Sequence, residues 1–165
     1  MGLPGAGKTT MATTLAPLLS AVVFNGDAVR GNISRDLGFD HDDRVEHARR
    51  MGWICDRVVE AGGTVIADFV CPTEETRAAF GNAFTIWLDR ISASRFEDTN
   101  HMFVAPKRFD LRVTAEGAPQ YWAEQALARL RPSFDPQRPT VLDEASESIS
   151  VSNVRRLSAF PRRRR

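Results

Sequence analysis

Apolar residues along this chain follow two alternating patterns. Short unbroken apolar runs are typical of buried strands, whereas apolar residues repeated every three or four positions are typical of a helix face. Such runs predict strands over residues 21–24, 64–67 and 84–88, and we expect a fourth strand over residues 110–113. The repeats predict helices over residues 9–19, from 43 to the glycine pair at 62 and 63, over 73–80, and over 118–130.

Strands that alternate with helices predict an α/β domain with a parallel sheet, in which ligands bind at the carboxyl ends of the strands. Asp43 and Glu46 have the spacing of a capping box for the long second helix. Residues 89–107 show no steady period and predict a long functional loop or lid. We expect one domain over residues 1–131 and an extended or disordered tail over residues 132–165, which are rich in Pro, Ser and Arg.

Composition narrows the class of protein. The chain has 165 residues, of which 42% are hydrophobic and 26% charged, values that are typical of one globular domain. Cys55 and Cys71 are too few for a disulfide framework or a zinc site, which favours a reducing compartment. With no apolar stretch of membrane-spanning length and no leader pattern before the first motif, we expect a cytoplasmic protein without a membrane partner.

Charge is concentrated at the end of the chain. Residues 152–165 hold six arginines and no acid, which leaves 16 basic against 21 acidic residues in the rest. Either this tail is a solvated end, or it contacts a polyphosphate or a nucleic acid. We favour the solvated end, because a short arginine run alone is weak evidence for nucleic-acid binding.

The first residues carry the most specific motif. Residues 2–9 read GLPGAGKT, the spacing of a P-loop, in which glycines turn main-chain N–H groups towards phosphate oxygens. Lys8 is predicted to reach the β- and γ-phosphates of ATP, and the Thr9 hydroxyl to bind Mg²⁺. The predicted ATP site is therefore Gly2, Gly5, Ala6, Gly7, Lys8, Thr9 and Thr10. The fold predicted from this motif is the three-layer, nucleotide-kinase-like fold of P-loop NTPases.

Two aspartates follow predicted strands and are expected beside the P-loop. Asp27 follows the strand at 21–24, and Asp68 ends the run TVIAD. A kinase needs one acid on the metal side and one that accepts the proton of the attacking hydroxyl. We assign Asp27 as the base and Asp68 to the metal together with Thr9, and the reverse assignment stays open. Either residue could instead cap the next helix.

The sequence also resembles the adenylylsulfate (APS) kinases, which read D-G-D-N-V-R, D-L-G-F, D-R-x-E-N and R-R-x-G in this order. The matching segments here are NGDAVR (25–30), DLGF (36–39), DRVEH (43–47) and RRMG (49–52). The resemblance implies a P-loop phosphotransferase that moves the γ-phosphate of ATP to the 3′-hydroxyl of adenylyl sulfate. It further implies that Arg30 and Arg44 bind the anionic groups of the acceptor, that Phe39 and Phe69 enclose its base, and that His47 takes the place of a contacting asparagine. Guanidinium groups and aromatic rings suit these roles, although surface ion pairs and core packing are the alternatives.

Several positions depart from that family pattern. Asn25 replaces the first acid of D-G-D, and VCPT (70–73) replaces I-S-P-Y. The lid segment at residues 88–100 also differs in sequence from that of the family. Either Arg90 or Arg95 is expected to neutralise charge on the transferring phosphoryl group, and Arg95 is assigned to catalysis. The acceptor could then be another hydroxyl, such as a hydroxymethyl-pyrimidine in phage DNA. A nucleotide-binding module without turnover is the remaining alternative.

A P-loop normally follows a strand, but only Met1 precedes Gly2. Two explanations are open at this point. Either the translation start is placed too late, or the sheet closes without its central strand and loses a row of main-chain hydrogen bonds.

Overall fold

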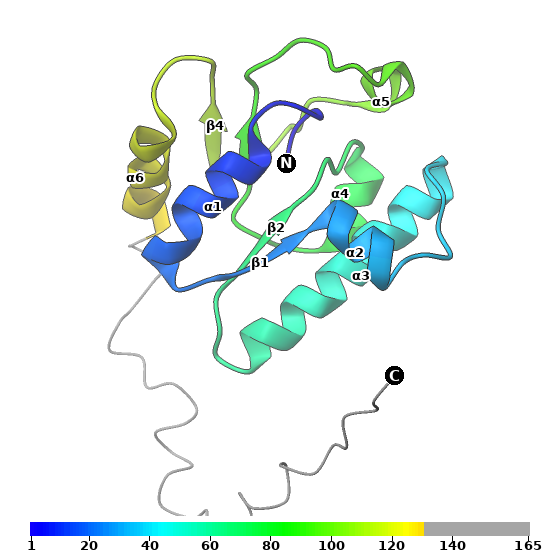
Figure 1. The fold of residues 1–165 in the computed structure, drawn as a ribbon, viewed down its shortest axis with the longest axis horizontal. Coiled ribbons are helices and arrows are strands. Elements are labelled where there is room, and N and C mark those ends of the chain that lie inside the picture. The colour runs from blue at the N-terminus through cyan, green and yellow to red at the C-terminus, as the bar shows by residue number, and fades with distance from the viewer. Residues whose placement is uncertain (131–165) are drawn as a thin grey trace, which may run out of the picture. The chain divides into compact units, whose positions relative to one another are not determined.

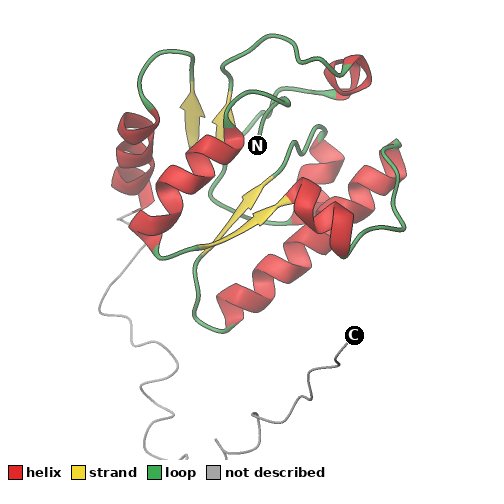
Figure 2. Ribbon diagram, in the orientation of Figure 1, coloured by secondary structure: helices red, strands yellow, loops and turns green. Residues whose placement is uncertain are grey.

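The computed structural model describes residues 1–130, so the predicted tail at 132–165 lies outside the described residues. Helices and strands alternate along the described part (Figures 1 and 2). The helices are α1 (Lys8–Leu19), α2 (Gly26–Asn32), α3 (His41–Glu60), α4 (Glu74–Phe80), α5 (Glu97–Met102) and α6 (Pro119–Leu130). The strands are β1 (Val22–Asn25), β2 (Val65–Asp68), β3 (Ile86–Leu88) and β4 (Leu111–Val113).

The predicted helices form, with one error in capping. α3 begins at His41, and its cap is Asp40, whose side chain accepts from the Asp43 N–H at 2.9 Å. The capping box expected from Asp43 and Glu46 is therefore wrong. Glu46 instead binds arginines one turn further along the same helix, where an i,i+3 or i,i+4 spacing brings opposite charges together.

Two helices were not predicted. α2 occupies the segment directly after β1, where the Asn25 side chain caps it by accepting from the Ala28 N–H at 3.1 Å. α5 lies inside the stretch expected to be a long loop, so the lid prediction for residues 89–107 needs correction to a loop that contains one short helix. Both helices have six or seven residues, too short for a hydrophobic period to be read from the sequence.

The strands are parallel as predicted, but they form two sheets of two strands each rather than one sheet. β1 pairs with β2, placing Asn25 opposite Asp68 in register, and β3 pairs with β4. Figure 2 shows the strands between α1 and α6 on one side and α3 and α4 on the other. Within the described residues, no strand-to-strand pairing joins β2 to β3.

Met1 lies between the two sheets. Its amino group donates to the Ile86 carbonyl at 2.8 Å, and its carbonyl accepts from the Leu88 N–H at 2.9 Å. The next residue, Gly2, donates to the Val70 carbonyl at 3.3 Å. These hydrogen bonds connect the start of the P-loop to both halves of the fold.

The main core joins α1 and α6 to β3 and β4. Its buried members are Ala6, Met11, Leu15, Leu88, Leu111, Val113, Ala123 and Ala126. On the other side, α3 packs closely on the end of α4, where a Cβ atom on Gly52 would come within 2.2 Å of the Phe80 carbonyl oxygen. Among the described helices, none has the length and apolar character needed to cross a membrane.

Candidate active site

The P-loop forms the turn that leads into α1. Gly5 and Gly7 have φ angles of +87° and +93°, a region that side-chain-bearing residues rarely adopt. The Lys8 ammonium group donates to the Leu3 carbonyl at 3.0 Å, so it curls back over its own loop. Burial lowers the pKa of Lys8, and the nearby charges of Asp68 and Asp27 oppose that shift. The loop thus combines glycines, a helix N-terminus and a partly buried ammonium group, which together suit a bound polyphosphate.

Asp68 lies beneath this loop at the end of β2. Its Oδ2 atom accepts from the Thr9 hydroxyl at 2.6 Å and from the Asn25 side-chain amide at 2.9 Å. Asp68 is only 4% exposed, and its other oxygen, Oδ1, is buried without a hydrogen-bond partner. A buried carboxylate oxygen without a donor is costly unless a ligand satisfies it.

The pair of Thr9 and Asp68 fits a magnesium ion. Mg²⁺ prefers oxygen ligands and is held in nucleotide sites by one or two protein groups together with phosphates and water. A hydroxyl and a carboxylate in contact provide such groups, and the unpartnered Oδ1 has capacity for another interaction. Within residues 1–130 no cluster of three or more His, Cys, Asp or Glu side chains has the arrangement of a metal site, so phosphates and water would have to complete the coordination.

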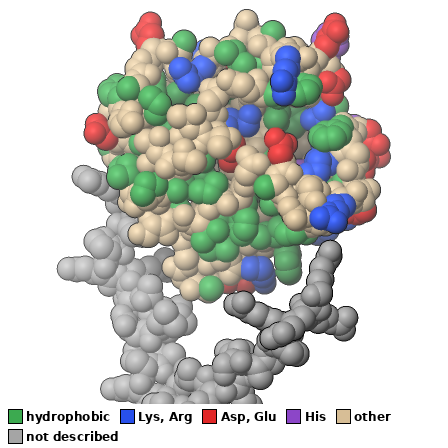
Figure 3. Space-filling model, viewed as in Figure 1, with side chains coloured by type: hydrophobic (Ala, Val, Ile, Leu, Met, Phe, Trp, Pro, Cys, Tyr) green, Lys and Arg blue, Asp and Glu red, His purple; other side chains and the backbone are tan. Residues whose placement is uncertain are grey.

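Asp27 differs from Asp68 in its surroundings. It lies in the first turn of α2 and is exposed, and its charge acts on Lys8, Arg30 and His47. The turn that carries it depends on Gly26, since a Cβ atom there would lie 2.5 Å from the Phe69 Cβ. The structure therefore holds one buried acid against Thr9 and one accessible acid near Lys8. Basic and acidic side chains gather near the middle of the face in Figure 3.

A second group of predicted residues meets at Phe39. The Arg30 guanidinium lies over the Phe39 ring, with 4.7 Å from Cζ to the ring centroid, and that of Arg44 lies at 5.7 Å. Arg44 also donates to the Phe39 carbonyl at 2.7 Å. The Phe39 side of this group is open, because Phe39 is 62% exposed. Two cations and an open aromatic face make a site suited to an anionic compound with a flat ring.

His47 and Phe69 lie on the inner side of this region. Their rings make an edge contact at 6.3 Å between centroids, and Phe69 also packs against Phe80 at 5.3 Å. Burial, followed by the charge of Arg30, lowers the pKa of His47 to about 4. Its Nδ1 atom is buried without a hydrogen-bond partner. No ring contact joins Phe69 to Phe39 among the described residues, so enclosure of a base between them stays a prediction.

The two lid arginines lie in different places. The Arg90 side chain passes the P-loop, since its Nη1 atom would lie 2.9 Å from a Cβ atom on Gly7. Arg95, the residue assigned to catalysis, lies over the Phe96 ring at 4.8 Å. In this conformation Arg90 is the lid arginine next to the predicted phosphate site.

Sequence reasoning missed three contributors. Asn25 was treated as the loss of an acid, yet it both caps α2 and donates to Asp68. Asp98 and Thr99 on α5 accept from Arg44 at 3.0 and 3.2 Å, which connects the lid to α3. The Asn25 cap could be found from the sequence, because Asn25 and Ala28 are three residues apart. The contacts of Arg44 with Asp98 and Thr99 span more than 50 residues, and no local sequence pattern indicates them.

Sequence comparisons with known proteins indicate one family. The sequence profile described as Adenylylsulphate kinase matches residues 1–94. A probable adenylyl-sulfate kinase of Aeropyrum pernix is 41% identical over 81 residues, which are 46% of this chain and 44% of that protein. An adenylyl-sulfate kinase of Bacillus pumilus is 42% identical over 81 residues, 46% of this chain and 41% of that protein. The matched region thus spans less than half the length of these relatives.

Among solved structures, the Mycobacterium tuberculosis APS kinase CysC, determined in complex with AMPPNP and APS, superposes with a TM-score of 0.71. The match covers 79% of this chain and 94% of that chain at 24% identity. At that identity the likeness establishes a shared P-loop fold. The predicted fold class is confirmed.

Proposed function

We propose that this chain, which belongs to the adenylylsulphate kinase family, transfers the γ-phosphate of ATP to the 3′-hydroxyl of adenylyl sulfate. The observation that carries the proposal is the contact of Thr9 with the buried Asp68 directly behind the Lys8 loop. Such a contact joins a P-loop hydroxyl to an acid at the end of a parallel strand, as phosphoryl transfer with magnesium requires.

On the donor side, residues 2–10 bind the phosphates of ATP through main-chain N–H groups and Lys8. The ammonium group of Lys8 exchanges its internal acceptor, the Leu3 carbonyl, for phosphate oxygens. Thr9 and Asp68 would hold Mg²⁺, which neutralises charge on the β- and γ-phosphates when it is bound. Arg90 or Arg95 adds positive charge from the lid, and the position of Arg90 beside Gly7 favours Arg90.

On the acceptor side, Asp27 takes the proton of the attacking hydroxyl. Its exposure and its location near Lys8 support this role over the reverse assignment, because a base needs access to the acceptor. Arg30 and Arg44 bind the phosphate and sulfate oxygens, and Phe39 stacks on the adenine ring. Since burial keeps His47 uncharged near neutral pH, this residue acts there as a neutral hydrogen-bonding group.

The proposal is tested by measuring ADP formation from ATP and Mg²⁺ alone, with adenylyl sulfate, and with hydroxymethyl-pyrimidine DNA. We expect turnover that depends on adenylyl sulfate and falls by at least about 100-fold in Lys8→Ala, because the lysine stabilises charge that develops in the transition state. Lys107→Ala is the matched control, since Lys107 is exposed and is the other lysine of the chain.

Three results would contradict the proposal. Turnover with the DNA alone would assign another hydroxyl acceptor. ATP binding without turnover on any acceptor would indicate a binding module. Equal loss of activity in Lys8→Ala and Lys107→Ala would remove the P-loop from the mechanism.

A further inference from the structure

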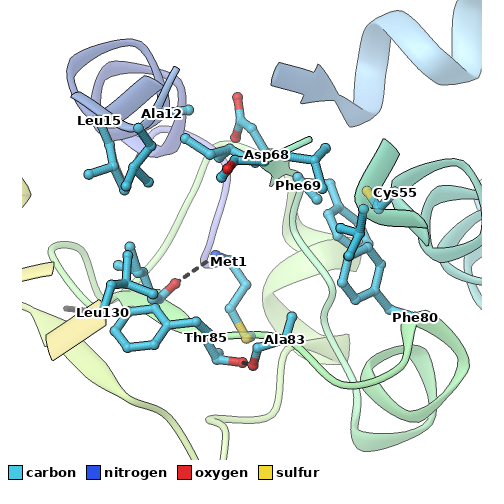
Figure 4. Close-up of a pocket in the computed structure, with 18 of the residues that line it drawn as sticks. Met1, Ala12, Leu15, Cys55, Asp68, Phe69, Phe80, Ala83, Thr85 and Leu130 are labelled. Carbon is cyan, nitrogen blue, oxygen red and sulfur yellow. Dashed lines mark hydrogen bonds between the residues drawn. The ribbon is translucent and has the colours of Figure 1, made fainter. Parts of the chain in front are cut away.

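Asn25 ends β1 directly beside the end of β2. In the parallel register Asn25 lies opposite Asp68, and the next residue, Gly26, begins α2. α2 starts so close to β2 that a Cβ atom on Gly26 would lie 3.5 Å from the Asp68 carbonyl oxygen. Figure 4 shows Asp68 and Phe69 as neighbours at the end of β2. Asn25 therefore lies between the strand that carries Asp68 and the helix that carries Asp27.

The two ends of the Asn25 side chain make different hydrogen bonds. Its oxygen accepts from the Ala28 N–H at 3.1 Å, which caps α2, and its Nδ2 group donates to Asp68 Oδ2 at 2.9 Å. The orientation of the amide is determined at both ends, because a main-chain N–H can only donate and an ionised carboxylate can only accept. One amide thus holds the acid on the metal side and the helix of the proposed base at the same time.

Smaller or charged side chains at position 25 would keep only part of this arrangement. Aspartate can cap α2, but it places a second carboxylate where the amide now lies 2.9 Å from Asp68, and like charges at such a distance repel each other. Serine can also cap α2, but its side chain is one atom shorter and carries no amide to reach Asp68. Alanine loses both contacts.

The donation from Asn25 also decides which oxygen of Asp68 is left for a ligand. Oδ2 accepts from Asn25 and from the Thr9 hydroxyl, whereas Oδ1 is buried and has no donor among the described residues. Groups that hydrogen-bond a metal-binding carboxylate fix its orientation, and losing one typically weakens metal affinity or activity by about 10- to 100-fold. Asn25 is such a group for Asp68.

We propose that Asn25 is a positioning residue for phosphoryl transfer, which orients Asp68 for Mg²⁺ and, through the cap of α2, holds Asp27 at the attacking hydroxyl. The part that concerns Asp27 rests on the proposed function, whereas the part that concerns Asp68 needs only ATP and Mg²⁺. Because Asn25 is neutral where the D-G-D pattern has an acid, the cation binds here together with the phosphates of ATP and not to the free protein.

The first experiment separates the donation to Asp68 from the helix cap. Asn25→Ser keeps an oxygen for the Ala28 N–H and loses the amide. We expect it to raise the Mg²⁺ concentration for half-maximal ATP binding by about tenfold, measured by calorimetric titration of ATP without any acceptor. Its Tm without nucleotide should fall by less than about 5 °C. Asn32→Ser is the matched control, because Asn32 donates to the Ala28 carbonyl at 2.8 Å from the other end of α2, and it should leave the Mg²⁺ dependence unchanged.

The second experiment measures the effect of charge at position 25 without nucleotide. Asn25→Asp should have a lower Tm than the parent, and about 10 mM Mg²⁺ should restore at least half of this loss, because a divalent cation offsets the repulsion of two carboxylates. NaCl at matched ionic strength should restore less, because it only screens the charges. The parent Tm should change by less than about 1 °C with Mg²⁺ alone.

The third experiment concerns the cap and Asp27. Asn25→Ala shares the loss of the amide with Asn25→Ser, but it also loses the cap. With saturating ATP, Mg²⁺ and adenylyl sulfate, we expect kcat to be at least about fivefold lower in Asn25→Ala than in Asn25→Ser, because α2 carries the proposed base.

Each part of the proposal has a result that overturns it. An unchanged Mg²⁺ dependence of ATP binding in Asn25→Ser, or the same change in Asn32→Ser, would remove Asn25 from the metal side. Equal kcat values in Asn25→Ala and Asn25→Ser would remove its role towards Asp27. A parent without turnover on adenylyl sulfate, but with the expected effect of Asn25→Ser on ATP binding, would contradict the proposed function and support the positioning of Asp68.

Discussion

The substitution Asp68→Asn is expected to stabilise the protein without nucleotide and to weaken binding of ATP with Mg²⁺. The carboxylate is 4% exposed and has two donors, Thr9 and Asn25, on one oxygen and none on the other. Asparagine can keep an acceptor towards both donors while removing the buried charge. Opposite effects on the free and the bound protein are typical of a residue retained for function rather than stability.

The magnitudes follow from these contacts. Removing an incompletely paired buried charge is expected to raise the free energy of unfolding by about 1–2 kcal/mol. The reason is that a neutral amide, whose NH2 takes the place of the unpartnered oxygen, costs less to desolvate than a carboxylate. Loss of attraction to the Lys8 ammonium group offsets part of this gain. In the bound state, losing a metal-binding carboxylate is expected to weaken affinity by about 10- to 100-fold, which lowers the ligand stabilisation at a fixed ATP concentration by about 1.4–2.7 kcal/mol.

The assay is chemical denaturation with and without saturating ATP and Mg²⁺. Thr9→Ser keeps the hydroxyl that contacts Asp68 and is the matched control, expected to leave both free energies within about 0.5 kcal/mol. A free Asp68→Asn protein that is less stable than the parent, with an unchanged increase on adding ATP and Mg²⁺, would refute the assignment of Asp68 to the metal side.

Three further predictions concern packing, protonation and acceptor binding. Gly52→Ala should lower the free energy of unfolding by about 3 kcal/mol, because its Cβ would meet the Phe80 carbonyl. Gly31→Ala should raise it by about 0.5–1 kcal/mol, because a Cβ atom at this position in α2 meets open space. Urea denaturation of the two variants compares these effects. The folded pKa of His47, about 4, is below its ordinary value of 6.5, so the unfolded chain binds more protons than the folded chain between pH 4 and 6.5. The free energy of unfolding should therefore fall by up to about 3 kcal/mol as pH drops through this window. His47→Asn should flatten that part of the profile of stability against pH. Arg44→Lys should raise the KM for adenylyl sulfate about tenfold with a smaller change in the KM for ATP, and equal changes in both would contradict its acceptor role.

The donor side of the site could be predicted because its chemistry is encoded locally. The P-loop spacing identifies Lys8 and Thr9 within a single segment, and apolar runs that end in Asp identify Asp68. Parallel strands then bring these segments together, since carboxyl ends of neighbouring strands meet at one edge. The contact between Thr9 and Asp68 thus follows from topology and needs no knowledge of side-chain packing.

The lid and the acceptor side could not be predicted to the same extent. Arg44 meets Asp98 and Thr99 across more than 50 residues, and that contact depends on how α5 folds within a segment with no apolar period. The choice between Arg90 and Arg95 depends on backbone direction after β3, which composition does not determine. Asn25 shows a different limit, because a substitution that removes a charge was interpreted as a loss, although the amide supplies a cap and a donor at once.

The start of the P-loop contacts both of the two sheets. The first P-loop residue, Gly2, is fixed by its donation to Val70 and by close packing on β3, where a Cβ atom would lie 2.5 Å from the Leu88 carbonyl oxygen. Met1, directly before it, contributes two hydrogen bonds to β3. Because these hydrogen bonds hold the start of the loop to both sheets, the loop loses less conformational freedom on binding a polyphosphate.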